Sequence, residues 1–204
     1  MKLQNKNIVI TGAADGIGYA LANRIHRENP KSLSLIDIND SVERVANNLR
    51  ADSYVVDVSN ENNFQSALNK IIDKNDSVDL FCSNAGIQQF GTLETSTEDW
   101  QKNWDVNVMS HVYASKVLIP HMKRQKSGYI LLTVSAAGLL NMPGALAYAT
   151  TKHAAMGLAE NLSIMFGDDG IKISTLCPQL VDTNMVRSAD ELPENHPLVK
   201  DGVI

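Results

Sequence analysis

Thr11-Gly12-Ala13-Ala14-Asp15-Gly16-Ile17-Gly18 follows a short apolar run, Ile8 to Ile10, and precedes a segment with helical periodicity. Glycine allows positive φ, and without a Cβ it lets a bound group come close to the backbone. A helix that begins after such a turn points the positive end of its dipole at an anion. The spacing Gly-x-x-x-Gly-x-Gly therefore predicts a strand, turn and helix that hold a dinucleotide pyrophosphate. An ordinary strand-to-helix turn is the alternative.

Outward from this turn, apolar runs alternate with longer helix-period segments. The expected strands are 7–10, 32–37, 53–56, 80–83, 129–134 and 172–176. The expected helices are 17–27, 41–49, 60–73, 98–125 with a break inside it, and 148–166. Runs such as Ile130-Leu131-Leu132 are too continuously apolar to have one face in water. We therefore expect an α/β fold with a doubly wound parallel sheet covered by helices on both sides.

Bulk properties limit the class of protein. A length of 204 residues favours one domain, and a net charge of -5 offers no basic excess for nucleic acid or an anionic membrane surface. There is no signal-peptide core and no run of about 18 apolar residues, so we expect a cytoplasmic protein without a membrane partner. Cys82 and Cys177 are expected to be buried, reduced thiols, and the scattered histidines predict no metal site.

Two acidic residues bear on the choice of dinucleotide. Asp37 ends the second expected strand 25 positions after Gly12, near the offset of about 20 at which an acid meets the adenosine ribose hydroxyls. A carboxylate there repels a 2′-phosphate, and Asp15 adds a second negative charge inside the turn. We therefore predict NAD(H) over NADP(H). The alternative for Asp37 is a simple turn or helix cap.

A tyrosine and a lysine one helical turn apart are the candidate catalytic pair. Tyr148 and Lys152 share a helix face, and Ser135 ends the strand before them. Lowering the pKa of a tyrosine from about 10 to about 7 requires about 4 kcal/mol. A positive charge about 4 Å away supplies roughly this amount at an effective dielectric constant near 20. Tyr148 would then exchange a proton with a substrate alcohol or carbonyl whose oxygen also binds the Ser135 hydroxyl, while hydride moves to or from the nicotinamide.

Each of these features alone is weak, since a tyrosine and a lysine at this spacing occur by chance in many helices and Ser135 could merely end a strand. Their combination is specific. The strand end, the loop with Gly138 and Gly144, and a helix with Tyr148 in its first turn follow in the order that an α/β active site needs.

These motifs together resemble the short-chain dehydrogenase/reductase family over nearly the whole chain. The family shares a Thr-Gly-x-x-x-Gly-x-Gly turn, an Asn-Ala-Gly segment, a catalytic asparagine, a serine and Tyr-x-x-x-Lys. The matching residues here are Thr11 to Gly18, Asn84-Ala85-Gly86, Asn107, Ser135, Tyr148 and Lys152. The resemblance implies a Rossmann-like single domain spanning residues 1–204, and a homodimer or homotetramer built on its long helices.

The resemblance also implies roles. Asn84 to Gly86 would back the adenosine side and stabilise the sheet, Asp57 and Val58 would flank the adenine, and Lys152 would bind the nicotinamide ribose. Asn107 would hold a water that links Lys152 to solvent, with a helix-breaking asparagine as an equally weighted alternative. The expected cofactor contacts are Gly12, Asp15, Gly16, Ile17, Gly18, Asp37, Asp57, Val58, Asn84, Ala85, Gly86, Tyr148, Lys152, Pro178 and Thr183.

The chain departs from the family pattern twice. Gln179 follows Pro178 where members usually have glycine, and we expect it to reach the nicotinamide or substrate space. The sequence ends at Ile204, whereas the family usually adds a seventh strand, so that last strand is expected to be missing. Residues 184–204 are expected to form a substrate loop and tail.

The substrate is expected to be a small, moderately apolar alcohol or ketone. The candidate pocket residues are Gln88, Ala137, Leu139, Leu140, Asn141, Gln179 and the segment from Asn184 to Leu198. The preferred hypothesis is an NAD(H)-dependent oxidoreductase acting on a secondary alcohol and its ketone. A non-catalytic dinucleotide-binding or redox-sensing module is the alternative, and an epimerase or dehydratase with the same cofactor site is a third.

Overall fold

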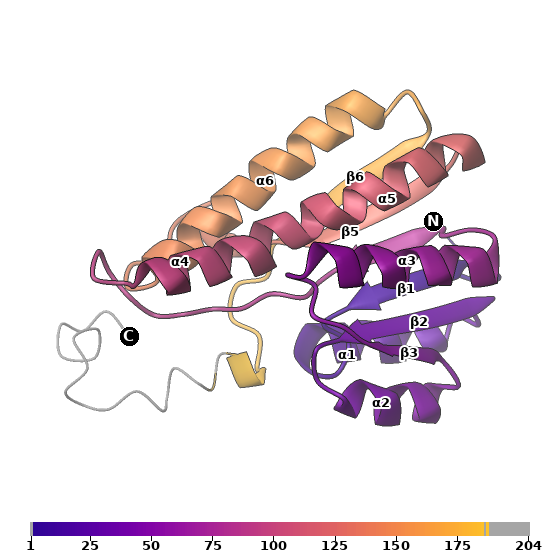
Figure 1. Cartoon of the computed structure of the whole chain (residues 1–204), viewed down its shortest axis with the longest axis horizontal. Helices are drawn as coiled ribbons and strands as arrows, with labels where there is room; N and C mark the ends of the chain where they lie inside the picture. Colours follow the sequence, from indigo (N-terminus) through magenta and orange to yellow (C-terminus); the bar gives the residue numbers. More distant parts are fainter. Residues whose placement is uncertain (1, 186, 188–204) are drawn as a thin grey trace.

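The computed structural model describes residues 2–185 and 187, and within them the chain forms one six-stranded parallel sheet (Figure 1). The strand order is β3-β2-β1-β4-β5-β6. The strands are β1 (Asn7–Thr11), β2 (Ser32–Asp37), β3 (Asp52–Val55), β4 (Leu80–Ser83), β5 (Gly128–Thr133) and β6 (Ile171–Leu176). The winding direction reverses between β1 and β4, and ligands bind beyond the carboxyl ends of the strands at such a point.

Six α-helices connect the strands, together with two short helical turns. The helices are α1 (Gly16–His26), α2 (Ser41–Leu49), α3 (Glu61–Asn75), α4 (Thr97–Trp104), α5 (Ser110–Gln125) and α6 (Leu146–Phe166). The turns are the π-helical η1 (Asp105–Met109) and the 3₁₀ turn η2 (Ala136–Gly138). The doubly wound α/β architecture is therefore confirmed.

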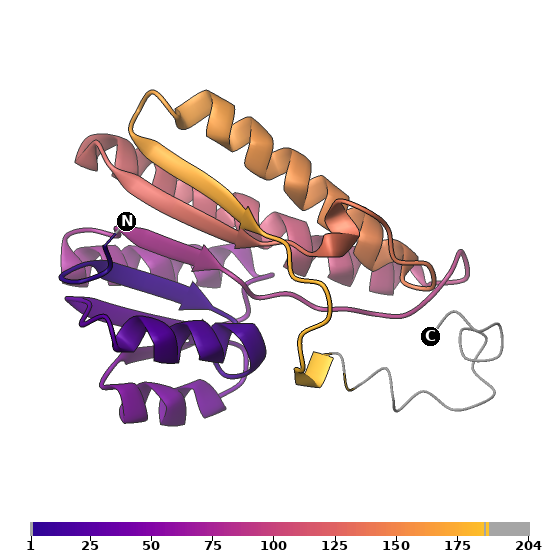
Figure 2. The ribbon, with the colours of Figure 1, turned by 180° about the vertical axis from the view of Figure 1, so that it is seen from behind.

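Two apolar clusters cover the two faces of the sheet. One joins alternate strand residues such as Phe81 and Ile130 to α3, α5 and α6. The other joins the intervening residues, such as Ile10 and Leu35, to α1 and α2. In Figure 2, α1 and α2 lie over the β1–β3 half of the sheet, and no helix of the described residues lies over β5 and β6 on that side. Tyr129 and Leu131 on this face are accordingly only partly buried.

The sequence pattern explains the elements locally. In α2 the buried residues Val42, Val45, Ala46 and Leu49 follow the i, i+3, i+4, i+7 spacing of an amphipathic helix. Asn60 caps α3 by accepting a hydrogen bond from the Asn63 amide. The observed strands begin and end within one residue of the expected ones.

Some details differ from expectation. The expected break within residues 98–125 is the π-helical turn η1, which keeps α4 and α5 continuous instead of separating them. The turn η2 was not predicted. Cys82 is buried as expected. Cys177, the residue after β6, is only half-buried and packs against the apolar cluster beneath α3, α5 and α6. The expected substrate segment is described only at 184, 185 and 187, and the question of a seventh strand falls on residues outside the described part.

The described residues contain neither a membrane-spanning helix nor a metal-binding cluster. None of their helices is long and apolar enough to cross a membrane. Among the same residues no group of three or more His, Cys, Asp or Glu side chains is placed to hold a metal ion.

Candidate active site

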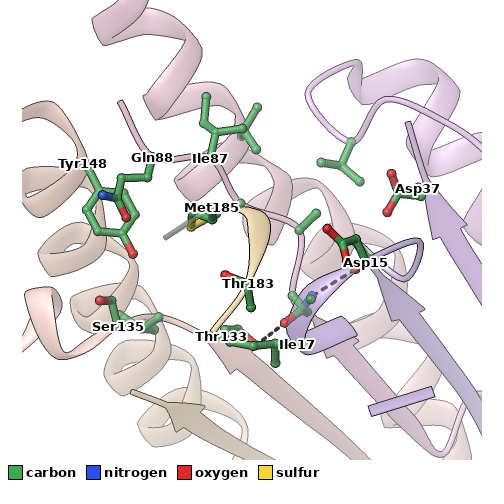
Figure 3. A pocket seen from close by; sticks show the side chains of 18 of the residues that line it. Asp15, Ile17, Asp37, Ile87, Gln88, Thr133, Ser135, Tyr148, Thr183 and Met185 are labelled. Atoms are coloured by element: carbon green, nitrogen blue, oxygen red, sulfur yellow. Dashed lines mark hydrogen bonds between the residues drawn. The ribbon is translucent and has the colours of Figure 1, made fainter. Parts of the chain in front are cut away.

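A cavity of about 500 Å³ opens at the carboxyl ends of the strands, at the point where the winding direction reverses (Figure 3). Most residues predicted for the site line it. These are Gly12, Asp15, Gly16, Ile17, Asp37, Asp57, Val58, Asn84, Ala85, Gly86, Ser135, Tyr148, Lys152, Pro178 and Thr183. The two other predicted site residues, Gly18 and Asn107, do not line the cavity. Figure 3 shows Tyr148 and Ser135 on one side, Asp15 and Asp37 on the other, and Thr183 between them.

The glycine turn brings three segments together. Gly12 and Gly16 have φ of 65° and 54°, values that residues with a side chain rarely adopt. A Cβ on Gly12 would lie 2.9 Å from the Ala85 Cα, and one on Gly18 would lie 1.9 Å from the Gly12 carbonyl oxygen. Gly18 therefore permits the turn to close, while Gly12 and Gly16 leave a cradle at the N-terminus of α1.

A hydrogen-bond network holds this cradle against the sheet. The Thr11 hydroxyl accepts bonds from the backbone amides of Asn84 and Ala85, at 2.9 and 3.0 Å. The Asn84 side-chain amide donates to the carbonyls of Thr11 and Gly12, at 3.1 and 3.3 Å. Its oxygen accepts from the Thr133 hydroxyl at 3.0 Å. Asn84 thus links β1, β4 and β5 at the edge of the cavity.

The acidic residues are held by local bonds. Asp37 accepts from the backbone amides of Ala14 and Asn39, both at 2.9 Å, so it stabilises the turns and also borders the cavity. Asp57 accepts from the Ser59 amide and hydroxyl, at 2.9 and 2.7 Å. Asp15 accepts a hydrogen bond from the Asn184 side chain. The cap alternative for Asp37 and its place on the cavity wall are therefore compatible.

Ser135, Tyr148 and Lys152 converge at the opposite end. Ser135 follows β5, and its hydroxyl accepts from the Ala137 amide at 3.1 Å. Lys152 is only 3% exposed, donates to the Thr133 carbonyl at 3.1 Å, and places its Nζ 5.6 Å from the centroid of the Tyr148 ring. Tyr148 is buried but reaches the cavity wall. The Lys152 ammonium therefore lies over the face of the Tyr148 ring.

Burial governs the acidity of this pair. Burial raises the pKa of Tyr148, and its interaction with the Ser135 side chain lowers that pKa in part. Burial lowers the pKa of Lys152 to about 8. With the protein's own groups, the shift of the Tyr148 pKa is therefore opposite to the expected one, because the loss of water around the phenol outweighs the hydrogen bond with Ser135.

Asn107 sits in the π-helical turn and fixes the loop after β4. Its side-chain oxygen accepts from the Ile87 amide, and its nitrogen donates to the Ile87 carbonyl, both at 2.9 Å. The same nitrogen donates to the Thr151 hydroxyl at 3.2 Å. A Cβ on Gly86 would lie 3.2 Å from the Asn107 oxygen and 3.4 Å from the Lys152 Nζ. Gly86 thus lets both groups come close, and the π-helical turn replaces the helix break considered above.

A buried pair behind the site was missed by sequence reasoning. The Ser83 hydroxyl lies 2.6 Å from the His111 Nδ1, and both residues are buried. The His111 Nε2 has no hydrogen-bond partner among the described residues. Burial, and secondarily the charge of Lys152, lowers the pKa of His111 to about 3. A lone histidine in an expected helix carried no signal for this pairing. The role of Thr133 was missed as well, because its contacts arise only when strands assemble.

The expected substrate residues divide into two groups. Gln88 and Gln179 line the cavity. Ala137, Leu139, Leu140 and Asn141 are not part of its wall, and Leu139 and Leu140 are exposed on the loop after η2. Contact of these four residues with the substrate stays a prediction, and Ala137 belongs to the same small buried cluster as Tyr148.

The strand order and the glycine turn at its reversal point define a dinucleotide-binding fold of the Rossmann type. Residues 6–193 match the family model described as short chain dehydrogenase. The chain therefore belongs to the short-chain dehydrogenase family and is an oxidoreductase of the class that acts on CH–OH donors.

Individual similar proteins and structures support this family assignment. Meso-2,3-butanediol dehydrogenase from Serratia marcescens is 35% identical over 189 residues, which are 91% of this chain and 75% of that protein. A short chain dehydrogenase/reductase from Burkholderia phymatum in complex with NAD has a TM-score of 0.86 and 32% identity, covering 95% of this chain and 72% of that one. A structure from Beutenbergia cavernae with bound NADP has a TM-score of 0.87 and 26% identity, covering 93% and 79%. The relatives thus include complexes with either dinucleotide.

Proposed function

We propose that the protein is an NAD(H)-dependent oxidoreductase that interconverts a secondary alcohol and a ketone. The observation that carries this proposal is the convergence of Ser135, Tyr148 and Lys152 on one end of the same cavity whose other end is the glycine cradle. The domain extends over residues 1–204, and the segment from Asn184 onward serves as the substrate loop. The substrate is a small and moderately apolar molecule.

The cavity fits a nicotinamide dinucleotide. Gly12 and Gly16 line the cavity where the N-terminus of α1 meets it, and this suits a pyrophosphate. Asp37 would bind the adenosine ribose, and Asp57 with Val58 would flank the adenine. Pro178 and Thr183 would contact the nicotinamide end. The cofactor supplies or accepts the hydride.

The protein's residues handle the proton. Tyr148 protonates the carbonyl oxygen during reduction and takes the proton back during oxidation, while the Ser135 hydroxyl donates to the same oxygen. Lys152, largely protonated at pH 7 with a pKa of about 8, stabilises the phenolate and binds the nicotinamide ribose. Asn107 supports a water that passes protons between Lys152 and solvent.

The replacement of Tyr148 by phenylalanine tests this assignment. Because Tyr148→Phe removes the hydroxyl and keeps the ring, NADH affinity should stay within about twofold while turnover of a ketone panel falls by at least about 100-fold. NADH binding is followed by fluorescence and turnover at 340 nm. Wild-type protein that binds NADH yet oxidises none across the panel favours the non-catalytic alternative. Retained turnover in the variant removes Tyr148 from the mechanism.

The preference for NAD(H) rests on the Asp37 carboxylate. Like charges a few ångströms apart cost about 1–4 kcal/mol near a protein surface, so the KM for NADPH should exceed that for NADH by at least about tenfold. Asp37→Asn keeps an oxygen that can accept from the Ala14 amide and removes the charge. This variant should lower the KM ratio about tenfold, whereas Asp40→Asn, an exposed neighbour off the cavity wall, should not. Comparable wild-type KM values for the two cofactors would contradict the preference.

A further inference from the structure

The loop after β4 is anchored on both sides of Gln88. On one side, Ile87 is bonded at both its amide and its carbonyl to the Asn107 side chain. On the other side, the Gly91 amide donates to the Gly144 carbonyl at 2.8 Å, and the Gly91 carbonyl accepts from the Leu146 amide at 3.0 Å. The second pair of bonds ties the loop to the start of α6, two residues before Tyr148. The backbone of Gln88 is therefore fixed beside the candidate catalytic tyrosine.

Two consecutive glutamines in this loop behave differently. The Gln89 amide donates to Asp99 at 2.8 Å, and its oxygen accepts from the Asn103 side chain, so α4 uses both of its polar atoms. The Gln88 amide makes no hydrogen bond to any residue in the described part of the chain, and it lines the cavity. Figure 3 shows the Gln88 side chain on the same side of the cavity as Tyr148 and Ser135. Gln88 thus presents an unused donor and an unused acceptor there.

The surroundings determine what this amide can bind. Among the described residues the cationic side chains on the cavity wall are Lys102 of α4 and Lys152, which is buried against the Thr133 carbonyl. The wall also includes apolar side chains such as Val134 and Val181, and Tyr148 packs against Phe90 and Met142. An amide has both a donor and an acceptor, so it matches a hydroxyl group, which also has both. A ligand that covers the amide without bonding it would leave a desolvated polar group.

We propose that Gln88 binds a second, neutral oxygen of the substrate, on the carbon next to the reacting one, so that the enzyme favours α-hydroxy ketones and the corresponding 1,2-diols. This inference rests on the proposed function, because it requires the carbonyl oxygen to lie between Ser135 and Tyr148. The Gln88 amide then accepts from, or donates to, the neighbouring hydroxyl. It acts as a specificity residue and takes no part in proton transfer.

Paired substrates and variants test the inference. With NADH, we compare kcat/KM for 2-hydroxycyclohexanone and cyclohexanone, which differ by one hydroxyl. One neutral hydrogen bond corresponds to about a tenfold preference for the hydroxylated ketone in the wild type. Gln88→Leu should reduce this ratio to about one while cyclohexanone turnover is kept. Gln88→Met, which keeps the length of the side chain and has no amide donor or acceptor, should reduce the ratio in the same way and so guards against a packing defect in Gln88→Leu. Gln4→Leu, at an exposed glutamine that does not line the cavity, should preserve the ratio.

The outcomes separate the two proposals. A wild-type ratio near one, or a tenfold ratio that survives both Gln88 substitutions, overturns the role of Gln88 and leaves the oxidoreductase mechanism intact. Wild-type protein that binds NADH and reduces neither ketone nor any other carbonyl overturns the proposed function, and the inference with it. Melting temperature and NADH affinity, measured for every variant, show whether a lost ratio reflects a damaged fold.

Discussion

At the scale of single residues, Lys152 places a positive charge in the interior with one hydrogen bond and no carboxylate partner among the described residues. Its pKa is about 8 in the folded protein and 10.5 in the unfolded chain. Below pH 8 both states hold the proton and the cost of burying the charge is fully present. Between pH 8 and 10.5 the folded state loses its proton first, so the free energy of unfolding should rise with pH there.

Replacing Lys152 by methionine should therefore stabilise the protein while abolishing turnover. The pKa difference corresponds to about 3 kcal/mol, and the Thr133 carbonyl left without its donor reduces the gain to about 2 kcal/mol. Urea denaturation of Lys152→Met and wild type at pH 7 measures this gain, which should shrink at pH 10. Lys172→Met, on the exposed side of β6, is the matched control. A Lys152→Met variant that is less stable at pH 7 would contradict the argument.

At the scale of elements, the Ser83 and His111 pair joins β4 to α5 behind the site. The pKa of His111 is about 3 when folded and 6.5 when unfolded, so between these values only the unfolded chain binds the proton. The free energy of unfolding should therefore fall with decreasing pH from about 6.5 toward 3, by up to about 1.4 kcal/mol per unit from this residue.

The double variant Ser83→Ala with His111→Leu should flatten this part of the pH profile. It removes both polar groups together and so leaves neither one buried without a partner. Stability by urea denaturation at pH 7, 5.5 and 4.5 gives the slope, and His153→Gln on the exposed face of α6 serves as the comparison. An unchanged slope in the double variant would mean that His111 takes up its proton in the folded state near its ordinary pKa.

At the scale of the whole molecule, α6 carries apolar side chains that the described residues leave exposed. Ile164 is 84% exposed and Met165 is 62% exposed near the end of the helix (Figure 1). We propose that the protein is a homodimer or homotetramer and that this end of α6 contacts a second copy. Ile164→Glu should then shift sedimentation toward a smaller species. Leu93→Glu, equally exposed on the loop after β4, should not, and an unchanged pattern for Ile164→Glu would exclude this contact.

The fold and much of the candidate site follow from local pattern. Strand and helix periodicities located β2, β4 and α2 to the residue, and the i, i+4 spacing placed Tyr148 and Lys152 on one helix face. The rest could not be predicted because it depends on contacts that exist only in the folded chain. The pKa of Tyr148 is raised by burial, and the partner of Lys152 is the backbone carbonyl of Thr133. Leu139 and Leu140, after η2, are exposed and do not line the cavity.

The strand order also bears on how the polypeptide is made. β1 pairs on its two sides with β2 and β4, so all its sheet partners have left the ribosome once Ser83 has emerged. Asn84, which binds the carbonyls of Thr11 and Gly12 in the glycine turn, emerges directly after Ser83. At that point Ser135, Tyr148 and Lys152 are still to be translated. Nascent chains stalled just before Ser135, with Asn84 already clear of the ribosome, would thus hold an adenosine-binding half without the means to react. Free nicotinamide dinucleotide in the cell would be able to act as a folding ligand for that half during synthesis.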